Sequence, residues 1–180
     1  MIAALRLARK ARGRARVVLV STQPHFVERI RLHEDAVGSV RARSPLARML
    51  EGTGIEVRVG MARAVDRRAR RVRVETEDGA IDDAFDHLLL ATGSGGATPP
   101  VPGLAAHAWS IASEAPALAL RARLAALAGG RVVVCGGGLT GVELAAEIGE
   151  RRPNLHVTLV SSGDVAPALG ARAREHVRTE

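Results

Sequence analysis

The stretch Val132–Ile148, VVVCGGGLTGVELAAEI, decides the fold of this chain. Four apolar residues run into a cluster of glycines, and an alanine-rich pattern with helical spacing follows. A second apolar run, HVTLV at residues 156–160, comes after Pro153, which ends the helix. The stretch therefore predicts a strand, a glycine turn, a helix and a second strand over residues 131–160, which is the βαβ unit of an α/β fold.

Three glycines of the turn, Gly136, Gly138 and Gly141, match the pattern G-x-G-x-x-G. The pattern alone is weak, but with a strand before it and a helix after it, it is typical of a dinucleotide-binding site. Gly136 permits the tight turn, Gly138 lets the backbone approach a pyrophosphate, and Gly141 lets helix and strand pack closely. The N-terminal N–H groups of the helix then bind the anion. The alternative is a tight turn that holds no ligand.

The sequence does not decide which residue would recognise the ribose of the nucleotide. An acid at the end of the second strand would bind the 2′-hydroxyl of NAD. Ser161 and Ser162 occupy this position, with Asp164 slightly later, while Arg172 and Arg174 are more remote candidates for a 2′-phosphate. NAD and NADP therefore both remain open.

Composition excludes several classes of protein. The hydrophobic fraction of 47% is typical of a globular protein, and no apolar run approaches the roughly 20 residues that cross a bilayer. Cys135 is the single cysteine, which excludes an internal disulfide, a C-x-x-C redox pair and a cysteine-cluster metal site. In its apolar strand it is expected to be a small core residue. The six histidines show no ligand spacing, so no metal site is predicted.

Charge is unevenly distributed along the chain. Residues 1–73 contain 18 Lys and Arg against 6 Asp and Glu, whereas residues 74–180 contain 8 against 13. A basic half can bind nucleic acid, but Phe26, Phe85 and Trp109 are the only aromatic residues available for base stacking, so no nucleic-acid partner is expected. The arginine-rich first 20 residues resemble a mitochondrial targeting segment; we favour the alternative, a helix that feeds a buried strand at 17–20.

The remaining elements follow from periodicity and turn residues. We expect a short helix before Gly38, another over PLARMLEG at 45–52, and a small antiparallel β excursion from residue 55 to about 85. An apolar strand, HLLLATGSGG at 87–96, leads to a Pro/Gly connector at 97–103. A helix over EAPALALRARLAALAGG then precedes the glycine turn. The connector predicts two domains, 1–103 and 104–180.

The segments GGGLTGVELAAEI, FDHLLLATGS and PPVPGL, together with their placement along the chain, resemble the flavin-dependent pyridine-nucleotide oxidoreductases with two dinucleotide domains. Within that superfamily the chain looks most like type II NADH dehydrogenases. The resemblance implies a Rossmann-like three-layer fold with a partial FAD-binding domain, 1–103, and a partial NAD(P)-binding domain, 104–180. It also implies hydride transfer from NAD(P)H to FAD, and then electron transfer to a small acceptor such as a quinone.

The resemblance also assigns residues. Residues Gly136, Gly137, Gly138, Leu139, Thr140 and Gly141 would hold the NAD(P)H pyrophosphate, and Ala91, Thr92 and Gly93 would pass close to FAD. Glu143 matches a family acid near the nicotinamide and flavin, although a capping role in the first turn of its helix is an equal alternative. A cytoplasmic protein, peripheral at the inner face of the membrane and dimeric in its parent form, is the corresponding expectation.

Three features depart from the family pattern. The family places FAD on a glycine turn before the first helix, whereas this sequence begins at Met1 within the equivalent of that helix. Ser21, in STQP, replaces the acid that would hold the FAD ribose, and the sequence stops at Glu180. We therefore expect a fragment of a longer oxidoreductase. The alternative function is a non-catalytic nucleotide-binding or interaction module.

Overall fold

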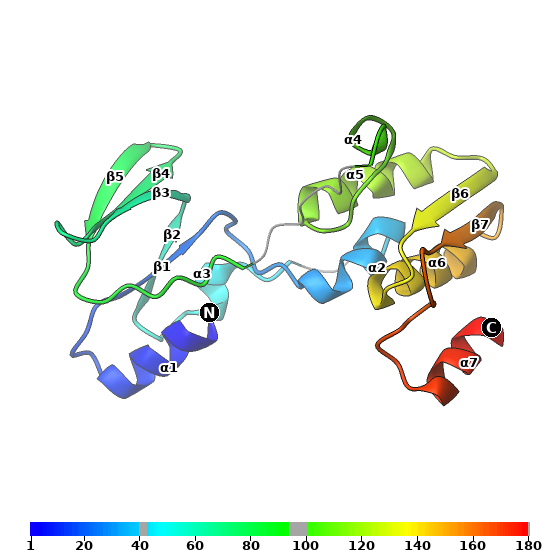
Figure 1. The fold of residues 1–180 in the computed structure, drawn as a ribbon. Coiled ribbons are helices and arrows are strands. Elements are labelled where there is room, and N and C mark those ends of the chain that lie inside the picture. The colour runs from blue at the N-terminus through cyan, green and yellow to red at the C-terminus, as the bar shows by residue number, and fades with distance from the viewer. Residues whose placement is uncertain (40–42, 94–100, 180) are drawn as a thin grey trace. The chain divides into compact units, whose positions relative to one another are not determined.

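The computed structural model describes residues 1–39, 43–93 and 101–179 (Figure 1). The chain forms two compact units, the first comprising Met1–Val27 with Ala42–Gly93 and the second Glu28–Arg41 with Ser94–Glu180. The predicted domains at 1–103 and 104–180 stay a prediction, and residues 97–100 of the expected connector lie outside the described residues. The fold class is confirmed, because the units combine helices with parallel and antiparallel strands.

The first unit is built on a parallel strand pair with a helix against it. Helix α1 (Ile2–Ala11) is followed by β1 (Val17–Ser21), which confirms the helix feeding a strand. Strand β1 pairs in parallel with β2 (Ile55–Val59), from Val17 opposite Ile55 to Ser21 opposite Val59. Along the sequence, the short helix α3 (Leu46–Met49) directly precedes β2. The buried residues Val17, Leu50 and Ile55 form the core here, and the inner face of α1 packs on them.

A three-stranded antiparallel sheet completes the first unit. Strands β3 (Met61–Asp66), β4 (Arg71–Thr76) and β5 (Gly79–Ala84) pair in the order β3-β4-β5. Val72 and Val74 of the central strand are buried. The expectation of an antiparallel excursion beginning at residue 55 was wrong, because Ile55–Val59 pairs in parallel with β1 and buries Ile55 in the core under α1. The antiparallel part begins instead at Met61.

The apolar strand expected from residue 87 was also wrong. Residues 85–93 contain no strand, and Leu89 and Leu90 are 69% and 70% exposed. A strand needs a neighbour for its backbone hydrogen bonds. In the described residues β1 and β2 pair with each other and form no ladder with residues 85–93. The remainder of the predicted stretch, residues 94–96, lies outside the described residues.

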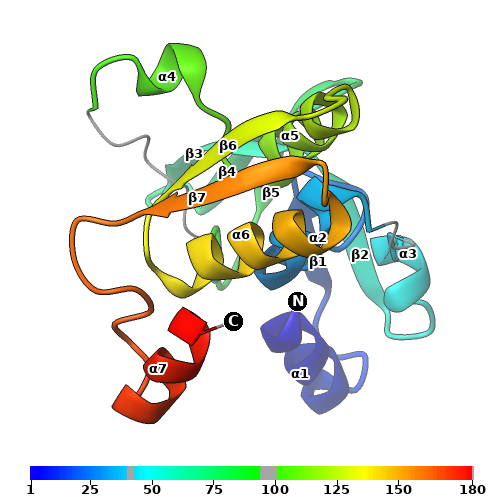
Figure 2. The ribbon, with the colours of Figure 1, turned by 90° about the vertical axis from the view of Figure 1, so that its right-hand side faces the viewer.

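The second unit contains the predicted βαβ element. Strand β6 (Gly130–Cys135) leads into α6 (Leu139–Arg151), and β7 (Leu155–Val160) returns parallel to β6, with Cys135 opposite Val160. Figure 2 shows α6 running along β7 on one side of the strand pair. Buried residues of this unit include Val134 of β6, Leu155 of β7 and Ile148 of α6. The strand–turn–helix–strand prediction is confirmed.

Further helices pack against this element within the second unit. The short turn η1 (Arg29–Arg31) leads into α2 (Leu32–Val37), which contacts both α5 (Glu114–Ala125) and α6 and buries Leu32 and Ala36 (Figure 1). Helix α4 (Leu104–His107) precedes α5, and α7 (Ala171–Thr179) follows β7. The other face of the β6–β7 pair is open, since Val133 and Val160 are 58% and 50% exposed.

Cys135 lies on this open side, so the expectation of a core cysteine was wrong. Successive residues of a strand point to opposite faces, and Cys135 therefore shares the face of Val133, while Val134 between them is buried.

In the part of the chain that the structure describes, none of the helices has the length and apolar character needed to span a bilayer.

Candidate nucleotide-binding site

The glycine turn lies between the end of β6 and the start of α6, as predicted. Gly136 has φ 126°, a conformation that side-chain-bearing residues rarely adopt. Its N–H donates to the carbonyl oxygen of Val160 at 2.8 Å, which fixes the start of the turn to the carboxyl end of β7. Glycine at position 136 is therefore required by the backbone itself.

Gly141 is required for a different reason, the close approach of α6 to the turn. A Cβ atom at this position would lie 3.1 Å from the carbonyl carbon of Gly136 and would overlap the carbonyl oxygen. Backbone atoms cannot swing aside as the end of a flexible side chain can. The third glycine of the pattern thus allows the first turn of α6 to pack directly on the strand end, as the sequence predicts.

Gly137 packs against the loop that follows β7. A Cβ atom there would lie 2.7 Å from the Cβ of Ser161. The Gly137 carbonyl accepts a hydrogen bond of 2.6 Å from the N–H of Ala166. Gly137 thus contacts the protein itself, and its contact with a nucleotide stays a prediction.

Gly138 is the glycine that the fold does not explain. It has φ −71° and ψ 169°, which any residue adopts, and a Cβ atom there would meet no described heavy atom within 4 Å. Nothing in the described protein therefore requires glycine at the N-cap of α6. The open space beside its backbone fits the close approach of a ligand, and this is the glycine predicted to face a pyrophosphate.

The N-terminus of α6 supplies donors for such a ligand. The N–H groups in the first turn of a helix have no acceptor within the helix, and no side chain caps α6 in the described structure. Leu139 and Thr140, the first two residues of this 13-residue helix, are exposed. The positive end of the helix dipole and free N–H groups bind phosphate groups. The residues present therefore fit a dinucleotide pyrophosphate, although contact with Leu139 and Thr140 themselves stays a prediction.

Glu143 is the fifth residue of α6, and no acid lies in the first turn of this helix. The first-turn capping alternative was therefore wrong, because the helix begins only at Leu139. Glu143 Oε2 lies 3.6 Å from Nδ1 of His33, which comes from α2. The Glu143 side chain is 50% exposed, whereas that of His33 is 12% exposed. No local pattern could indicate this neighbour, because His33 lies 110 positions before Glu143.

The candidates for ribose recognition lie in the loop after β7. Ser161 packs against Gly137, and its hydroxyl accepts a bond of 3.4 Å from the N–H of Gly163. The Asp164 carboxylate pairs with the Arg174 guanidinium of α7 at 3.0 Å. An acid and a base therefore lie together beside this loop, and the choice between NAD and NADP remains open.

The residues predicted to lie near FAD belong to the first unit. Ala91, Thr92 and Gly93 are exposed, and Gly93 has φ 73°. The Ser21 hydroxyl, at the end of β1, is engaged with the turn after it: it donates to the Gln23 carbonyl at 2.9 Å. Contact between these residues and FAD stays a prediction. Within the described residues, no cluster of three or more His, Cys, Asp or Glu side chains could hold a metal ion.

Strand, glycine turn, helix and parallel strand together define an α/β protein of the dinucleotide-binding class. The whole chain, residues 1–180, matches the model of the family described as pyridine nucleotide-disulphide oxidoreductase, and the chain belongs to that family. This confirms the resemblance. The family's cofactors are FAD and a nicotinamide nucleotide.

Named relatives agree with the family. The chain is 34% identical over 164 residues to the NADH dehydrogenase-like protein MT1860 of Mycobacterium tuberculosis (strain CDC 1551 / Oshkosh), covering 87% of this chain and 39% of that protein. It is 28% identical over 144 residues to demethylphylloquinone reductase NdbB of Synechocystis sp. (strain ATCC 27184 / PCC 6803 / Kazusa), covering 75% and 36%. The structure of an NAD-dependent persulfide reductase from A. fulgidus superposes with a TM-score of 0.82 at 25% identity, covering 98% and 36%. The chain thus spans less than two-fifths of each of these three relatives.

Proposed function

We propose that this chain supplies the nicotinamide-nucleotide site of an FAD-dependent NAD(P)H oxidoreductase. Bound flavin would accept a hydride from NAD(P)H and pass two electrons to an acceptor, with protons taken up from solvent. The observation that carries the proposal is Gly138: it lies at the N-terminus of α6, open to a ligand, and nothing in the described fold requires a glycine there. The family match supports the redox chemistry.

Each part of the predicted site has a proposed task. The glycine turn 136–141, at the N-terminus of α6, would bind the nucleotide pyrophosphate through backbone N–H groups. Glu143 would lie toward the nicotinamide end, the position that the family resemblance assigns to it. Ala91, Thr92 and Gly93 border the flavin. A quinone is the proposed acceptor, supported by the name of the quinone reductase among the relatives. We further propose a cytoplasmic protein that contacts a membrane peripherally and forms a homodimer in its parent form.

A non-catalytic nucleotide-binding module is the second candidate. It is favoured by one observation: the glycine turn and α6, which would bind the nucleotide, belong entirely to the second unit, so this binding needs no residue of the first unit. Such a module would bind NAD(P)H through the second unit and would not require flavin.

The two candidates are separated by the absorption spectrum of the purified chain after incubation with FAD and gel filtration. The oxidoreductase proposal expects a retained flavin band that bleaches when NADH or NADPH is added without oxygen. A folded protein without flavin that still binds NADH would support the module. If flavin is retained, Glu143→Gln should slow bleaching by at least about tenfold while FAD stays bound. An unchanged bleaching rate would remove Glu143 from the proposed site.

A further inference from the structure

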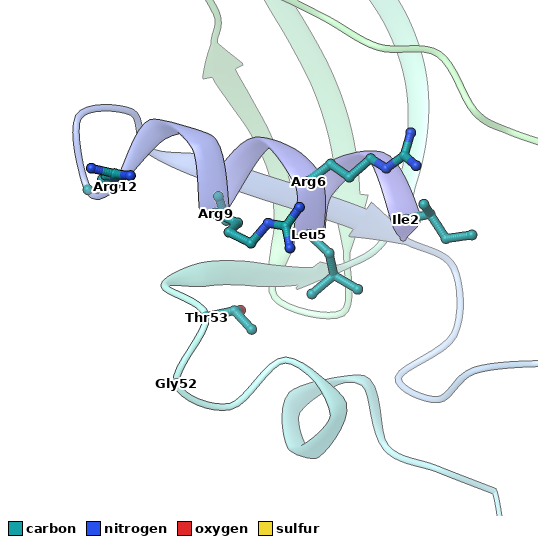
Figure 3. Close-up of a pocket in the computed structure, with 9 residues that line it drawn as sticks. Ile2, Leu5, Arg6, Arg9, Arg12, Gly52 and Thr53 are labelled. Atoms are coloured by element: carbon teal, nitrogen blue, oxygen red, sulfur yellow. The ribbon is translucent and has the colours of Figure 1, made fainter.

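Charged side chains converge in the second unit rather than in the pocket of the first. That pocket, of about 710 Å³, opens between α1 and the turn after α3 (Figure 3). Arg6 and Arg9 of α1 and Arg12 directly after it line the pocket, but their side chains extend in different directions along the helix. The pocket therefore gives an anion no point at which these guanidinium groups meet.

His33 of α2, in the second unit, lies between two carboxylates. Its Nδ1 is 3.6 Å from Oε2 of Glu143 on α6, and its Nε2 is 3.9 Å from Oε1 of Glu34, the next residue. The His33 side chain is 12% exposed. An imidazole can present an N–H to both carboxylates only when both of its nitrogens are protonated, and it then carries a positive charge. His33 and Glu143 therefore form an ion pair when the imidazole is charged.

Packing holds α2, and with it His33, against α6. Leu32 and Ala36, which lie on either side of His33 in the sequence, are buried, and α2 contacts both α5 and α6. The buried residues of α5 are apolar, namely Ala117, Leu120 and Leu124. The imidazole thus approaches Glu143 from a helix that the core of the second unit fixes in place.

The other charges around His33 leave Glu143 as its main partner. Glu34 pairs with Arg31 of η1 at 2.9 Å between Oε1 and Nη1, and Arg151 of α6 also attracts Glu34. In the part of the chain that the structure describes, His33 is the basic group that contacts Glu143. The charge of Glu143 is therefore compensated when the imidazole is protonated and uncompensated when it is neutral. Histidine side chains ordinarily change charge between about pH 5 and 8.

Glu143 lies one helical turn from the proposed pyrophosphate site. Leu139 and Thr140 begin α6, and Glu143 follows them by four and three positions, so it lies on the same side of the helix. In the proposed function, on which this inference rests, its carboxylate lies toward the nicotinamide ring. That ring carries a positive charge in NAD⁺ and none in NADH, so an uncompensated carboxylate favours NAD⁺.

We propose that His33 is a positioning residue for Glu143, and that it makes the preference of the site for NAD⁺ or NADH depend on pH. The protonated imidazole holds the carboxylate against α2 and compensates its charge. As the pH rises and the imidazole loses its proton, the uncompensated carboxylate attracts the charged nicotinamide ring more strongly. The affinity for the oxidised nucleotide relative to the reduced one therefore rises with pH.

The test is calorimetric titration of the chain with NAD⁺ and NADH, and with NADP⁺ and NADPH, at about pH 6 and about pH 8.5. Both forms of a nucleotide share the pyrophosphate, so effects of pH on its binding cancel in the ratio of the two affinities. The affinity for the oxidised form relative to the reduced form should rise at least about threefold between these pH values in the parent chain. This rise should disappear in His33→Gln and in Glu143→Gln.

A matched control is His156→Gln, which removes another histidine of the second unit, from β7. It should keep the rise of the parent chain, and circular dichroism and gel filtration establish that each variant folds. A ratio that is indifferent to pH in the parent chain, or a rise that persists in His33→Gln, would overturn the role of His33. Loss of the rise in His156→Gln would also overturn it, because the effect would not be specific to His33.

A double-mutant cycle tests the ion pair without any nucleotide. Urea unfolding of the parent chain, His33→Gln, Glu143→Gln and the double variant should show a coupling of about two- to fivefold in the unfolding equilibrium constant at about pH 6. The coupling should vanish at about pH 8.5, where the imidazole is neutral. No coupling at the lower pH would overturn the proposal. Coupling in a folded chain that binds none of the nucleotides would keep the ion pair but remove its role, because the proposed function itself would have failed.

Discussion

Replacing Gly141 with alanine tests the packing of α6 on the glycine turn. The added methyl carbon would lie 3.1 Å from the carbonyl carbon of Gly136 and would overlap its oxygen. The carbonyl cannot rotate away cheaply, because the Gly136 N–H is bonded to Val160 at 2.8 Å and Gly136 already has φ 126°. The first turn of α6 must therefore move away from β6.

The expected cost is about 3 kcal/mol in the free energy of unfolding, near the upper end of the usual range for an overpacked site. At an m-value of roughly 1–3 kcal/mol per molar urea, the midpoint should fall by about 1–3 M. Urea unfolding followed by far-ultraviolet circular dichroism measures this shift.

Gly149 gives a matched control in the same helix. A Cβ atom at this position meets no described atom within 4 Å. Because alanine has a higher helix propensity than glycine, Gly149→Ala should stabilise the chain by about 0.5–1 kcal/mol. If Gly141→Ala proves as stable as Gly149→Ala, the close approach of helix and turn described above is refuted.

Three further predictions concern other parts of the chain. A side-chain hydrogen bond from Arg16 lowers the pKa of Glu56. The pair therefore stabilises the first unit at pH values above the ordinary carboxyl pKa, and this stabilisation is lost as the pH falls through the lowered pKa of the native state. In Arg16→Gln, an NMR titration should show a higher pKa for Glu56, and an unchanged pKa would contradict the ion pair. Gly60→Ala places a methyl group 2.7 Å from Cγ1 of Val74, so the urea midpoint of the first unit should fall by an amount equivalent to about 1–3 kcal/mol, whereas an unchanged midpoint would mean that β3 is not held so close. Cys135 is exposed, so the native chain should react with one equivalent of Ellman's reagent about as fast as the urea-unfolded chain, and a reaction slowed by a hundredfold or more would show that its face is covered.

The βαβ unit could be predicted because its signals are local. An apolar run, a G-x-G-x-x-G turn and a helical pattern follow one another within residues 131–160, and the structure places β6, α6 and β7 there. Gly136 and Gly141 have the backbone tasks that the pattern implies. Because these backbone roles depend mostly on neighbours a few positions away, a local sequence pattern is enough to predict them.

Features that depend on distant partners could not be predicted. Apolar and polar residues alternate at positions 55–59, as is typical of an antiparallel strand. In the structure, however, β1, almost 40 residues earlier, pairs with this segment in parallel. Residues 87–93 are apolar enough for a strand, yet no described strand pairs with them. The approach of His33 to Glu143 depends on the packing of α2 on α6, which no local pattern encodes.

The choice of face is a further limit of sequence patterns. Cys135 continues an apolar run, and such runs are typical of strands covered on both sides. In the structure α6 packs along one side of β6 and β7, while Val133, Cys135 and Val160 face the open side. An apolar sequence thus predicts a strand correctly without showing which of its faces is covered.

The proposed binding of the NAD(P)H pyrophosphate in the space beside Gly138 can be measured by titrating the chain with NADH and NADPH. Isothermal titration calorimetry should show binding of at least one nucleotide to the parent chain and to Gly149→Ala. Gly138→Ala should unfold within about 1 kcal/mol of the parent chain, because φ −71° suits alanine and no described atom is near. Its nucleotide affinity should nevertheless fall by at least about tenfold. Unchanged affinity in Gly138→Ala, or no binding of either nucleotide to the folded parent chain, would contradict nucleotide binding beside Gly138.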